Sequence, residues 1–280
     1  MNRIILLAWA AFFCAFNTSA QDDSCTLLSV YELIENMQLQ LDAQQETIDA
    51  QQETIDAILA EPASSVANLG DYLTVDNANH ILTISGANLH VNSGEGTTNS
   101  AVNGLGNVII GYDEDDGGDT KTGSHNLVVG KDHTYSSYGG IVVGYNSSTT
   151  GEYSSVSGGG INNTASGWGS SVSGGKSNTA SGDYSSVSGG KSNTASGYIS
   201  SVSGGSSSTA SGYISSVSGG SGNTASDEYC SVSGGKDNEA SGFYSSVSGG
   251  QANTASGDYS SVLGGTSNTA LGANSVNTGE

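Results

Sequence analysis

The chain has 280 residues, of which 42 are glycine and one is proline, and its formal net charge at pH 7 is −21. Nucleic acid is excluded as an expected partner, because phosphate contacts need many more basic side chains than this chain carries. The acidity fits the solubility of a long, flat β surface; binding of cations or basic partners remains the alternative.

Residues 1–20 have the features of a secretory signal peptide. Arg3 precedes an apolar run that ends at Phe16, and the small residues Thr18 and Ala20 fit cleavage after Ala20. The run is too short for a typical membrane span, although a retained anchor is the alternative. We therefore predict a secreted protein, extracellular or at a cell surface, with no integral membrane anchor.

Two cysteines follow the predicted signal peptide. Cys25 lies in a short leader, residues 21–26, where an oxidising compartment would permit a disulfide between chains. Cys230 stands where most other repeats have serine, and we interpret it as an incidental small residue.

Residues 27–60 carry a seven-residue apolar pattern typical of a coiled coil. The segment 43–49 recurs without change as 50–56, which fixes the heptad register. The residues expected at the two core rows are Leu27, Ile34, Leu41, Ile48 and Ile55 on one, and Val30, Met37, Gln44, Gln51 and Ile58 on the other. We expect a homotrimer, while the heptad rules alone leave a dimer or a tetramer open.

Pro62 is expected to end this helix, so residues 61–70 are predicted to be a linker. Residues 71–100 are predicted to form a short β adaptor. Its two or three strands are expected at 72–75, 81–84 and 89–91, because each of these segments alternates apolar with polar residues.

Residues 101–280 repeat with a period of about 15, which is typical of a solenoid. Each repeat has a valine and an alanine at fixed positions, and we predict that both point inward. The predicted core residues are Val172, Ala180, Val187, Ala195, Val202, Ala210, Val217, Ala225, Val232, Ala240, Val247, Ala255, Val262 and Ala270. The valine row is extended to Val108, Leu127, Ile141 and Val156 at its start and to Val276 at its end.

Glycines beside both rows are expected to supply positive φ or close backbone approach at two tight turns per coil. Asp227 replaces one single glycine, which we interpret as support for a left-handed turn residue there, since aspartate tolerates that conformation. A row of asparagines that includes Asn178 and Asn193 predicts amide hydrogen bonds along the stack. The predicted fold is mostly β, a parallel solenoid of about twelve coils of 14–16 residues after an α-helical coiled coil.

The units 107–111, 126–130 and 140–144 and the closing segment 270–276 resemble the head repeats of trimeric autotransporter adhesins, the YadA-like head. The resemblance implies a left-handed parallel β-roll, an obligate homotrimer and an adhesive role at a bacterial outer envelope. Its partners would be host, matrix or neighbouring-cell macromolecules. The chain departs from that family in three ways: its later units have glycine, as at Gly158 and Gly174, where the family has a branched apolar residue, its coiled coil comes first, and it lacks the family's anchor strands. Autotransport is therefore not expected.

We expect no enzymatic activity and no cofactor. The four histidines share no ligand spacing, and no histidine recurs beside the abundant serines. The best candidate for a metal is an acidic loop that would offer carboxylates to calcium, with a solvated loop as the alternative. Its candidate ligands are Asp113, Asp115, Asp116 and Asp119.

One turn position varies between acidic and aromatic residues, so we predict that it faces solvent. Its aromatic members are candidate surface-binding residues, with packing between chains as the alternative: Trp168, Tyr198, Tyr213 and Phe243. The predicted function is that of an adhesin-like binding protein. The alternatives are a purely structural matrix or filament protein and an ice-binding protein that uses the threonine row, which Glu239 interrupts.

Overall fold

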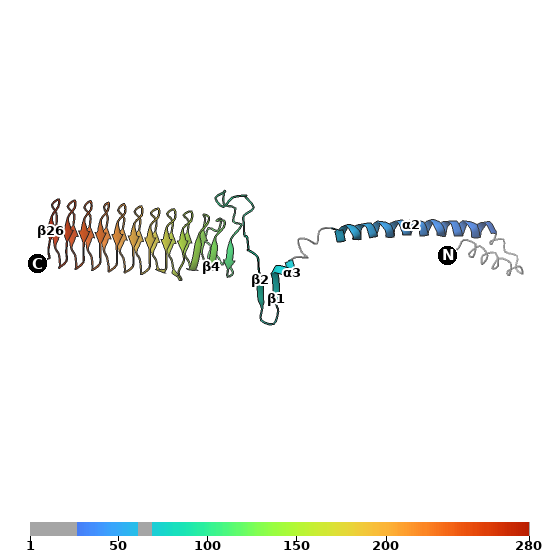
Figure 1. Cartoon of the computed structure of the whole chain (residues 1–280), viewed down its shortest axis with the longest axis horizontal. Helices are drawn as coiled ribbons and strands as arrows, with labels where there is room; N and C mark the ends of the chain where they lie inside the picture. The colour runs from blue at the N-terminus through green and yellow to red at the C-terminus, as the bar shows by residue number, and fades with distance from the viewer. Residues whose placement is uncertain (1–26, 61–68, 280) are drawn as a thin grey trace. The chain divides into compact units, whose positions relative to one another are not determined.

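The computed structural model describes residues 27–60 and 69–279, which fall into two units, residues 1–89 and 90–280 (Figure 1). The predicted signal peptide, the leader with Cys25 and most of the predicted linker lie outside the described residues. Within the described ranges, no helix combines the length and the apolar character that a membrane crossing needs.

The first unit contains helix α2 (Leu27–Ala60), which covers the segment with the heptad pattern. Side-chain amides of Gln38, Gln45 and Gln52 donate hydrogen bonds to the aspartate four residues later, at 3.1, 2.8 and 2.9 Å, and these pairs support the helix locally. The core-row residues Leu41, Ile48 and Met37 remain exposed, as do both glutamines. Of the other core-row residues, Val30 and Ile34 are half-buried and Ile55 is exposed, and the side chains of Leu27 and Ile58 lie outside the description. The helix is therefore present, and its assembly into a coiled coil stays a prediction.

A short helix and a hairpin complete this unit: α3 (Leu69–Tyr72), β1 (Leu73–Asp76) and β2 (Ile81–Ile84). The strands pair antiparallel, and the Asp76 carboxylate accepts hydrogen bonds from the backbone of Ala78 and from both the side chain and backbone of Asn79. These bonds, the Asn79 side chain first, hold the pKa of Asp76 below its usual value. Two expectations were wrong: Tyr72 ends the helix, and residues 89–91 form no strand, because alternation alone supplies no pairing partner.

The second unit is a parallel β-solenoid of about 11 turns, against about twelve expected (Figure 1). Its ten-stranded sheet consists of β5 (Thr134–Tyr135), β7 (Ser148–Thr149), β10 (Thr164–Ala165), β13 (Thr179–Ala180), β15 (Thr194–Ala195), β17 (Thr209–Ala210), β19 (Thr224–Ala225), β21 (Glu239–Ala240), β23 (Thr254–Ala255) and β25 (Thr269–Ala270).

The second sheet of the solenoid has fourteen strands. They are β3 (Val108–Ile110), β4 (Leu127–Lys131), β6 (Ile141–Tyr145), β8 (Ser155–Val156), β9 (Gly160–Ile161), β11 (Ser171–Val172), β12 (Gly175–Lys176), β14 (Ser186–Val187), β16 (Ser201–Val202), β18 (Ser216–Val217), β20 (Ser231–Val232), β22 (Ser246–Val247), β24 (Ser261–Val262) and β26 (Val276–Asn277).

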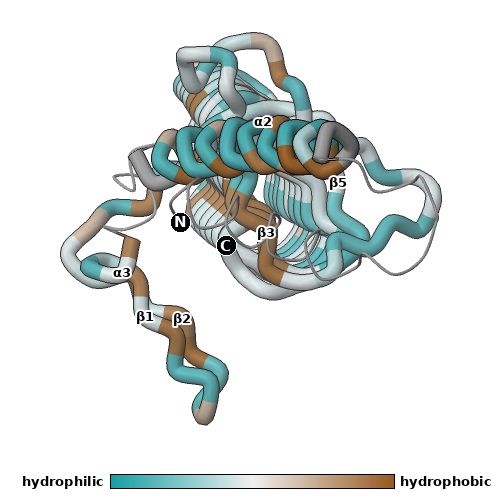
Figure 2. The backbone as a smooth tube through the Cα atoms, turned by 90° about the vertical axis from the view of Figure 1, so that its right-hand side faces the viewer, coloured by the Kyte–Doolittle hydropathy of each residue, from teal (hydrophilic) through white to brown (hydrophobic). Residues whose placement is uncertain are grey.

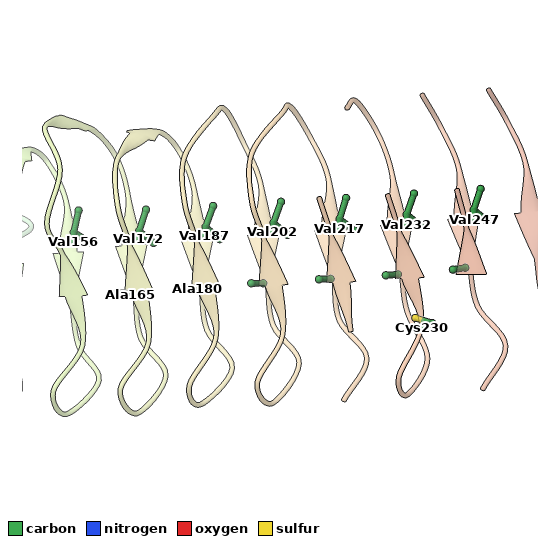
Figure 3. Close-up of a cluster of buried hydrophobic side chains, with 14 of the residues drawn as sticks. Val156, Ala165, Val172, Ala180, Val187, Val202, Val217, Cys230, Val232 and Val247 are labelled. Carbon is green, nitrogen blue, oxygen red and sulfur yellow. The ribbon is translucent and has the colours of Figure 1, made fainter. Parts of the chain in front are cut away.

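Successive coils stack like residues on like residues: Val187 lies between Val172 and Val202, and Ala195 lies between Ala180 and its equivalent in the next coil. The end-on view of Figure 2 shows this register as bands of equal hydropathy, and Figure 3 shows the valines aligned along the stack. Every predicted core residue from Val172 to Ala270 is buried, with at most 3% of its surface exposed. The apolar interior is therefore one valine and one alanine per coil.

The valine row is shifted by one residue at both ends of the solenoid. Val128 and Val142 are fully buried and continue in register into Val156. Their neighbours in sequence point outward, because alternate side chains of a strand face opposite sides and a slip of one residue reverses them. The residues wrongly predicted to point inward are Val108, Leu127, Ile141 and Val276.

A third interior row, beside the valines and the alanines, consists of asparagine. The Asn178 side-chain nitrogen donates to the carbonyl oxygens of Gly174, at 2.9 Å, and of Gly190 in the next coil, at 3.0 Å, while its oxygen accepts from the Asn193 backbone N–H at 3.0 Å. The predicted hydrogen bonding along the stack is present, but the asparagine side chains bond to backbone C=O and N–H groups and not to one another. Such bonds satisfy buried polar groups that would otherwise be costly.

The turn glycines serve two purposes. In the regular coils, from Gly174–Gly175 to Gly264–Gly265, the second glycine of each pair has positive φ, 88° at Gly190. Gly182 lacks positive φ and is needed because a Cβ there would overlap the Gly197 carbonyl oxygen. Asp227 likewise lacks positive φ, and the left-handed residue of its turn is Tyr229, at 57°. Our interpretation of Asp227 as a left-handed residue was therefore wrong.

Candidate functional site

The candidate site is the row of turns that leads from each alanine strand to the next valine strand. In one such turn the Ser185 N–H donates to the Gly182 carbonyl oxygen at 3.1 Å, and Asp183 and Tyr184 lie between them. Tyr184 is left-handed, with φ of 58°, and both central residues are exposed. This turn therefore presents two adjacent side chains to solvent.

Every turn from residue 152 to residue 259 carries an aromatic residue at one of these two positions or at both. The pairs are Glu152-Tyr153, Trp168-Gly169, Asp183-Tyr184, Tyr198-Ile199, Tyr213-Ile214, Glu228-Tyr229, Phe243-Tyr244 and Asp258-Tyr259. Variation at the first position predicted only part of this set, and the tyrosines at the second position were missed. The missed signal was that the two positions together always contain an aromatic residue.

These side chains contact one another without a break along the edge of the solenoid. Ring centroids of neighbours lie 4.5–6.0 Å apart. We call this set the aromatic ladder: Tyr138, Tyr153, Trp168, Tyr184, Tyr198, Tyr213, Tyr229, Phe243, Tyr244 and Tyr259. Aromatic pairs of this kind contribute ~0.5–1.5 kcal/mol each beyond the area they bury.

Several rings of the ladder lie nearly parallel to a neighbour. The interplanar angle is 4° for Tyr198 and Tyr213, 11° for Tyr229 and Tyr244, and 5° for Tyr244 and Tyr259. Their faces are therefore turned toward adjacent coils, which leaves ring edges for solvent. Of the predicted binding residues, Trp168, Tyr198 and Tyr213 are about 40% exposed and Phe243 is half-buried. This arrangement favours contacts through ring edges and hydroxyls over stacking on a ring face.

Carboxylates share the edge with the ladder and cap its backbone. Asp183 accepts from the Trp168 N–H at 2.9 Å, and Asp258 accepts from the Phe243 N–H at 3.3 Å, so an acid in one coil holds an aromatic residue in the preceding coil. A hydrogen bond to Glu152, followed by burial, raises the pKa of Tyr138 to about 12. The phenol therefore stays protonated at neutral pH, and the carboxylates supply the charge of the edge.

Cys230 lies inside the coil at this edge, only 1% exposed (Figure 3). Its thiol donates to the Asp227 carbonyl oxygen at 2.8 Å, and burial raises its pKa. It occupies the buried row that holds Ser185 and Ser215 in other coils. The side chain thus fills an interior position and is shielded from solvent.

The acidic loop brings together three of the four predicted calcium ligands. Ligand oxygens of Asp115, Asp116 and Asp119 lie within 4.8 Å of one another. Asp113 is engaged elsewhere: it pairs with Lys121 at 3.1 Å and accepts from the Tyr135 hydroxyl at 2.7 Å. Burial and the two neighbouring carboxylates raise the pKa of Asp119. Calcium takes six to eight oxygens, so three carboxylates would leave about half of its ligands to be found elsewhere.

No protein family model matches the chain, and no curated protein sequence matches it. The structure itself defines a parallel β-solenoid protein with an aromatic and acidic edge, preceded by a long helix.

Proposed function

We propose that the protein is a secreted, trimeric, adhesin-like fibre that binds macromolecules of host, matrix or neighbouring-cell surfaces through the aromatic and acidic edge of its solenoid. The observation that carries this proposal is the exposure of the aromatic ladder, in which Tyr184, Tyr244 and Tyr259 are about half exposed. Extended exposed apolar surface marks interaction sites. Tyrosine suits such a site because it offers contact area and a hydroxyl at a low cost in conformational entropy.

The two sheet faces of the solenoid are poorer candidates for a binding surface than the aromatic edge, because the outward side chains of their regular coils are small and polar. Outward positions of its regular coils are serine on the fourteen-stranded sheet and threonine on the ten-stranded sheet, as at Ser186, Ser201, Thr194 and Thr209. The in-register threonines are the feature an ice-binding array would need, but Glu239 stands exposed within that row. A purely structural filament protein is the main alternative, because the ladder also packs upon itself.

Three features support the homotrimer. Most of the described core-row residues of α2, such as Leu41 and Ile48, are exposed in the single chain, and a core of one valine and one alanine per coil is small. The first coils also present apolar side chains on the outer surface of the fourteen-stranded sheet, with Ile110 58%, Val108 38% and Ile141 37% exposed. A second and a third copy of the chain would cover the heptad residues of α2 and the apolar outer surface of the first coils. The resemblance to the YadA-like head implies such a trimer, and it also implies that the solenoid is left-handed.

We expect the mature protein to bind at least one class of matrix, glycan or cell-surface target in a solid-phase screen. The triple variant Trp168→Ser, Tyr198→Ser and Tyr213→Ser should weaken that binding at least tenfold. A control that changes Ser186 and Ser201 to alanine alters a flat face instead and should bind normally. Circular dichroism of both variants checks the fold. If no target binds, or if the two variants bind equally well, the edge is not the binding surface.

The trimer has its own prediction. Light scattering should give the mass of three chains, and replacing Gln44 and Gln51 with isoleucine should raise the melting temperature of the helical circular dichroism signal. A buried amide without a full set of partners costs ~1–3 kcal/mol, so each core layer should gain a similar amount. The paired control changes Glu46 and Glu53 to glutamine, because these side chains lie outside the core rows and make no hydrogen bond within the described helix. This control should leave the melting temperature nearly unchanged. A monomer mass would contradict the trimer, and a lower melting temperature in the isoleucine variant would contradict the assignment of Gln44 and Gln51 to a core row.

A further inference from the structure

Eight of the ten residues in the aromatic ladder are tyrosine, and their phenol rings touch from coil to coil. Packing alone would be served equally well by phenylalanine, which the ladder contains once, at Phe243. The nearly parallel tyrosine pairs have ring centroids 4.6 Å apart at Tyr229–Tyr244 and 5.4 Å apart at Tyr244–Tyr259 and Tyr198–Tyr213. Phenol rings that touch one another and have exposed edges can react with each other, which a binding surface does not require.

We propose that the stacked tyrosines of the ladder are a site of oxidative cross-linking, in which a haem peroxidase with hydrogen peroxide joins the phenol rings of successive coils through a carbon–carbon bond. The inference goes beyond the proposed function and needs no ligand for the edge. It assigns the ladder a role in hardening the fibre.

The step balances with peroxide as the oxidant. Each of two phenols gives up one electron and its hydroxyl proton to form a phenoxyl radical. The two radicals combine at carbons next to the oxygen-bearing carbon, and the ring hydrogen at each new bond moves to oxygen, which restores both phenols. Hydrogen peroxide takes up the two electrons and two protons and leaves as two molecules of water.

The ladder favours coupling within one chain. Tyr244 and Tyr259 are 47% and 55% exposed, so an oxidant reaches their edges, while each already has a phenol in contact. A partner held in place reacts as if it were present at very high concentration. Tyr112 provides the contrast, because it is 93% exposed and takes part in no aromatic contact within the described part of the chain. Exposure alone would make Tyr112 the first tyrosine to couple, and it would couple between molecules.

A bond between successive coils would act where the solenoid is weakest. Coils contact mainly their neighbours, so a solenoid opens by the separation of adjacent coils. A covalent link across one coil closes a short loop and restricts the unfolded chain, as a disulfide does. Cross-linked fibres should therefore melt at a higher temperature than untreated ones.

The test treats the full mature protein, at low concentration, with a haem peroxidase and hydrogen peroxide. We expect dityrosine fluorescence, a raised melting temperature, and cross-linked peptides by mass spectrometry that join Tyr244 to Tyr259 or Tyr229, and Tyr198 to Tyr213, within one chain. Tyr244→Phe keeps the ring stack and removes the reactive hydroxyl. It should abolish the links to residue 244 and leave the Tyr198–Tyr213 link unchanged.

Tyr112→Phe is the matched control and should leave the yield of links within one chain unchanged. Products that join only different chains, that increase with protein concentration and that contain mainly Tyr112 would overturn the proposal. Complete consumption of peroxide without dityrosine would overturn it as well. The adhesin proposal is tested separately by binding, so the failure of one is distinguishable from the failure of the other.

Discussion

Replacing Asn238 with leucine is expected to destabilise its part of the solenoid by at least ~2 kcal/mol, because the Gly234 carbonyl oxygen and the Asn253 N–H lose their partners at ~1–3 kcal/mol each. The Gly250 carbonyl oxygen also loses the amide but keeps the Lys236 N–H at 2.9 Å. The Asn238 amide donates to the carbonyl oxygens of Gly234 at 2.8 Å and Gly250 at 3.0 Å and accepts from the Asn253 N–H at 3.0 Å. Asn238 is 1% exposed, so water cannot replace these bonds. Leucine keeps the number and the branching of the side-chain heavy atoms, so the loss is mainly one of hydrogen bonds.

Hydrogen exchange on the assembled protein measures the effect. Amide protons of Asn253 and of the neighbouring coils should exchange faster, while distant coils keep their protection, since each coil contacts mainly its neighbours.

The chain also offers the reverse experiment. Ser208 occupies one asparagine position, and its backbone N–H donates to the Asn193 side-chain oxygen at 3.0 Å. Its hydroxyl donates to the Ser206 carbonyl oxygen at 3.5 Å and accepts no hydrogen bond from the Asn223 N–H within the described part of the chain. Ser208→Asn should therefore raise stability by ~0.5–1.5 kcal/mol. If the Asn238→Leu variant kept the hydrogen-exchange protection of the unchanged protein, the asparagine row would be dispensable.

The sequence was sufficient for the solenoid where its period is constant. Between Val172 and Val262 each coil repeats the same valine and alanine, and every coil but the one with Ser208 repeats the same asparagine. Stacked coils place like residues together, so identity along the sequence predicted adjacency in space. The burial of the alanine row follows from the same reasoning.

The prediction failed where the coil length changes. Val142 pairs with Val156 and Val156 with Val172, and these two steps differ in length. A count at fixed spacing therefore assigned Ile141 to the interior, although it pairs with the outward Ser155. Only the ladder of paired strands fixes the register there, and a slip of one residue reverses every side chain.

The aromatic edge could be predicted only in part. Trp168 and Tyr198 were found because their position varies, whereas Tyr184 and Tyr259 were overlooked because they follow it directly in sequence. The reason that both positions reach the same edge is conformational: the second residue is left-handed, with φ of 58° at Tyr184. Such a conformation is uncommon for residues other than glycine, asparagine or aspartate, so a tyrosine in the sequence does not predict it.

Ala210→Leu is expected to destabilise its coil by ~1–3 kcal/mol or more through overpacking. Ala210 is fully buried and stacks between Ala195 and Ala225, so an isobutyl group in place of the methyl group must displace a neighbouring coil or the facing valine strand. A close-packed interior has no spare volume for it. The damage should stay local, because solenoid coils transmit strain mainly to their neighbours.

The matched control is Ser211→Leu, one residue further along the same strand end. Ser211 is exposed, and the equivalent position of a later coil already holds leucine, at Leu271, which is 73% exposed. Hydrogen exchange on the assembled protein should show raised exchange around residues 195–225 in the alanine variant and nearly unchanged exchange in the serine variant. Both replacements add a leucine to the same coil, so only the side to which the residue points distinguishes them. Equal protection in the two variants would mean that the alanine row is not interior, and the inward and outward assignments of both sheets, together with the position of the aromatic edge, would have to be revised.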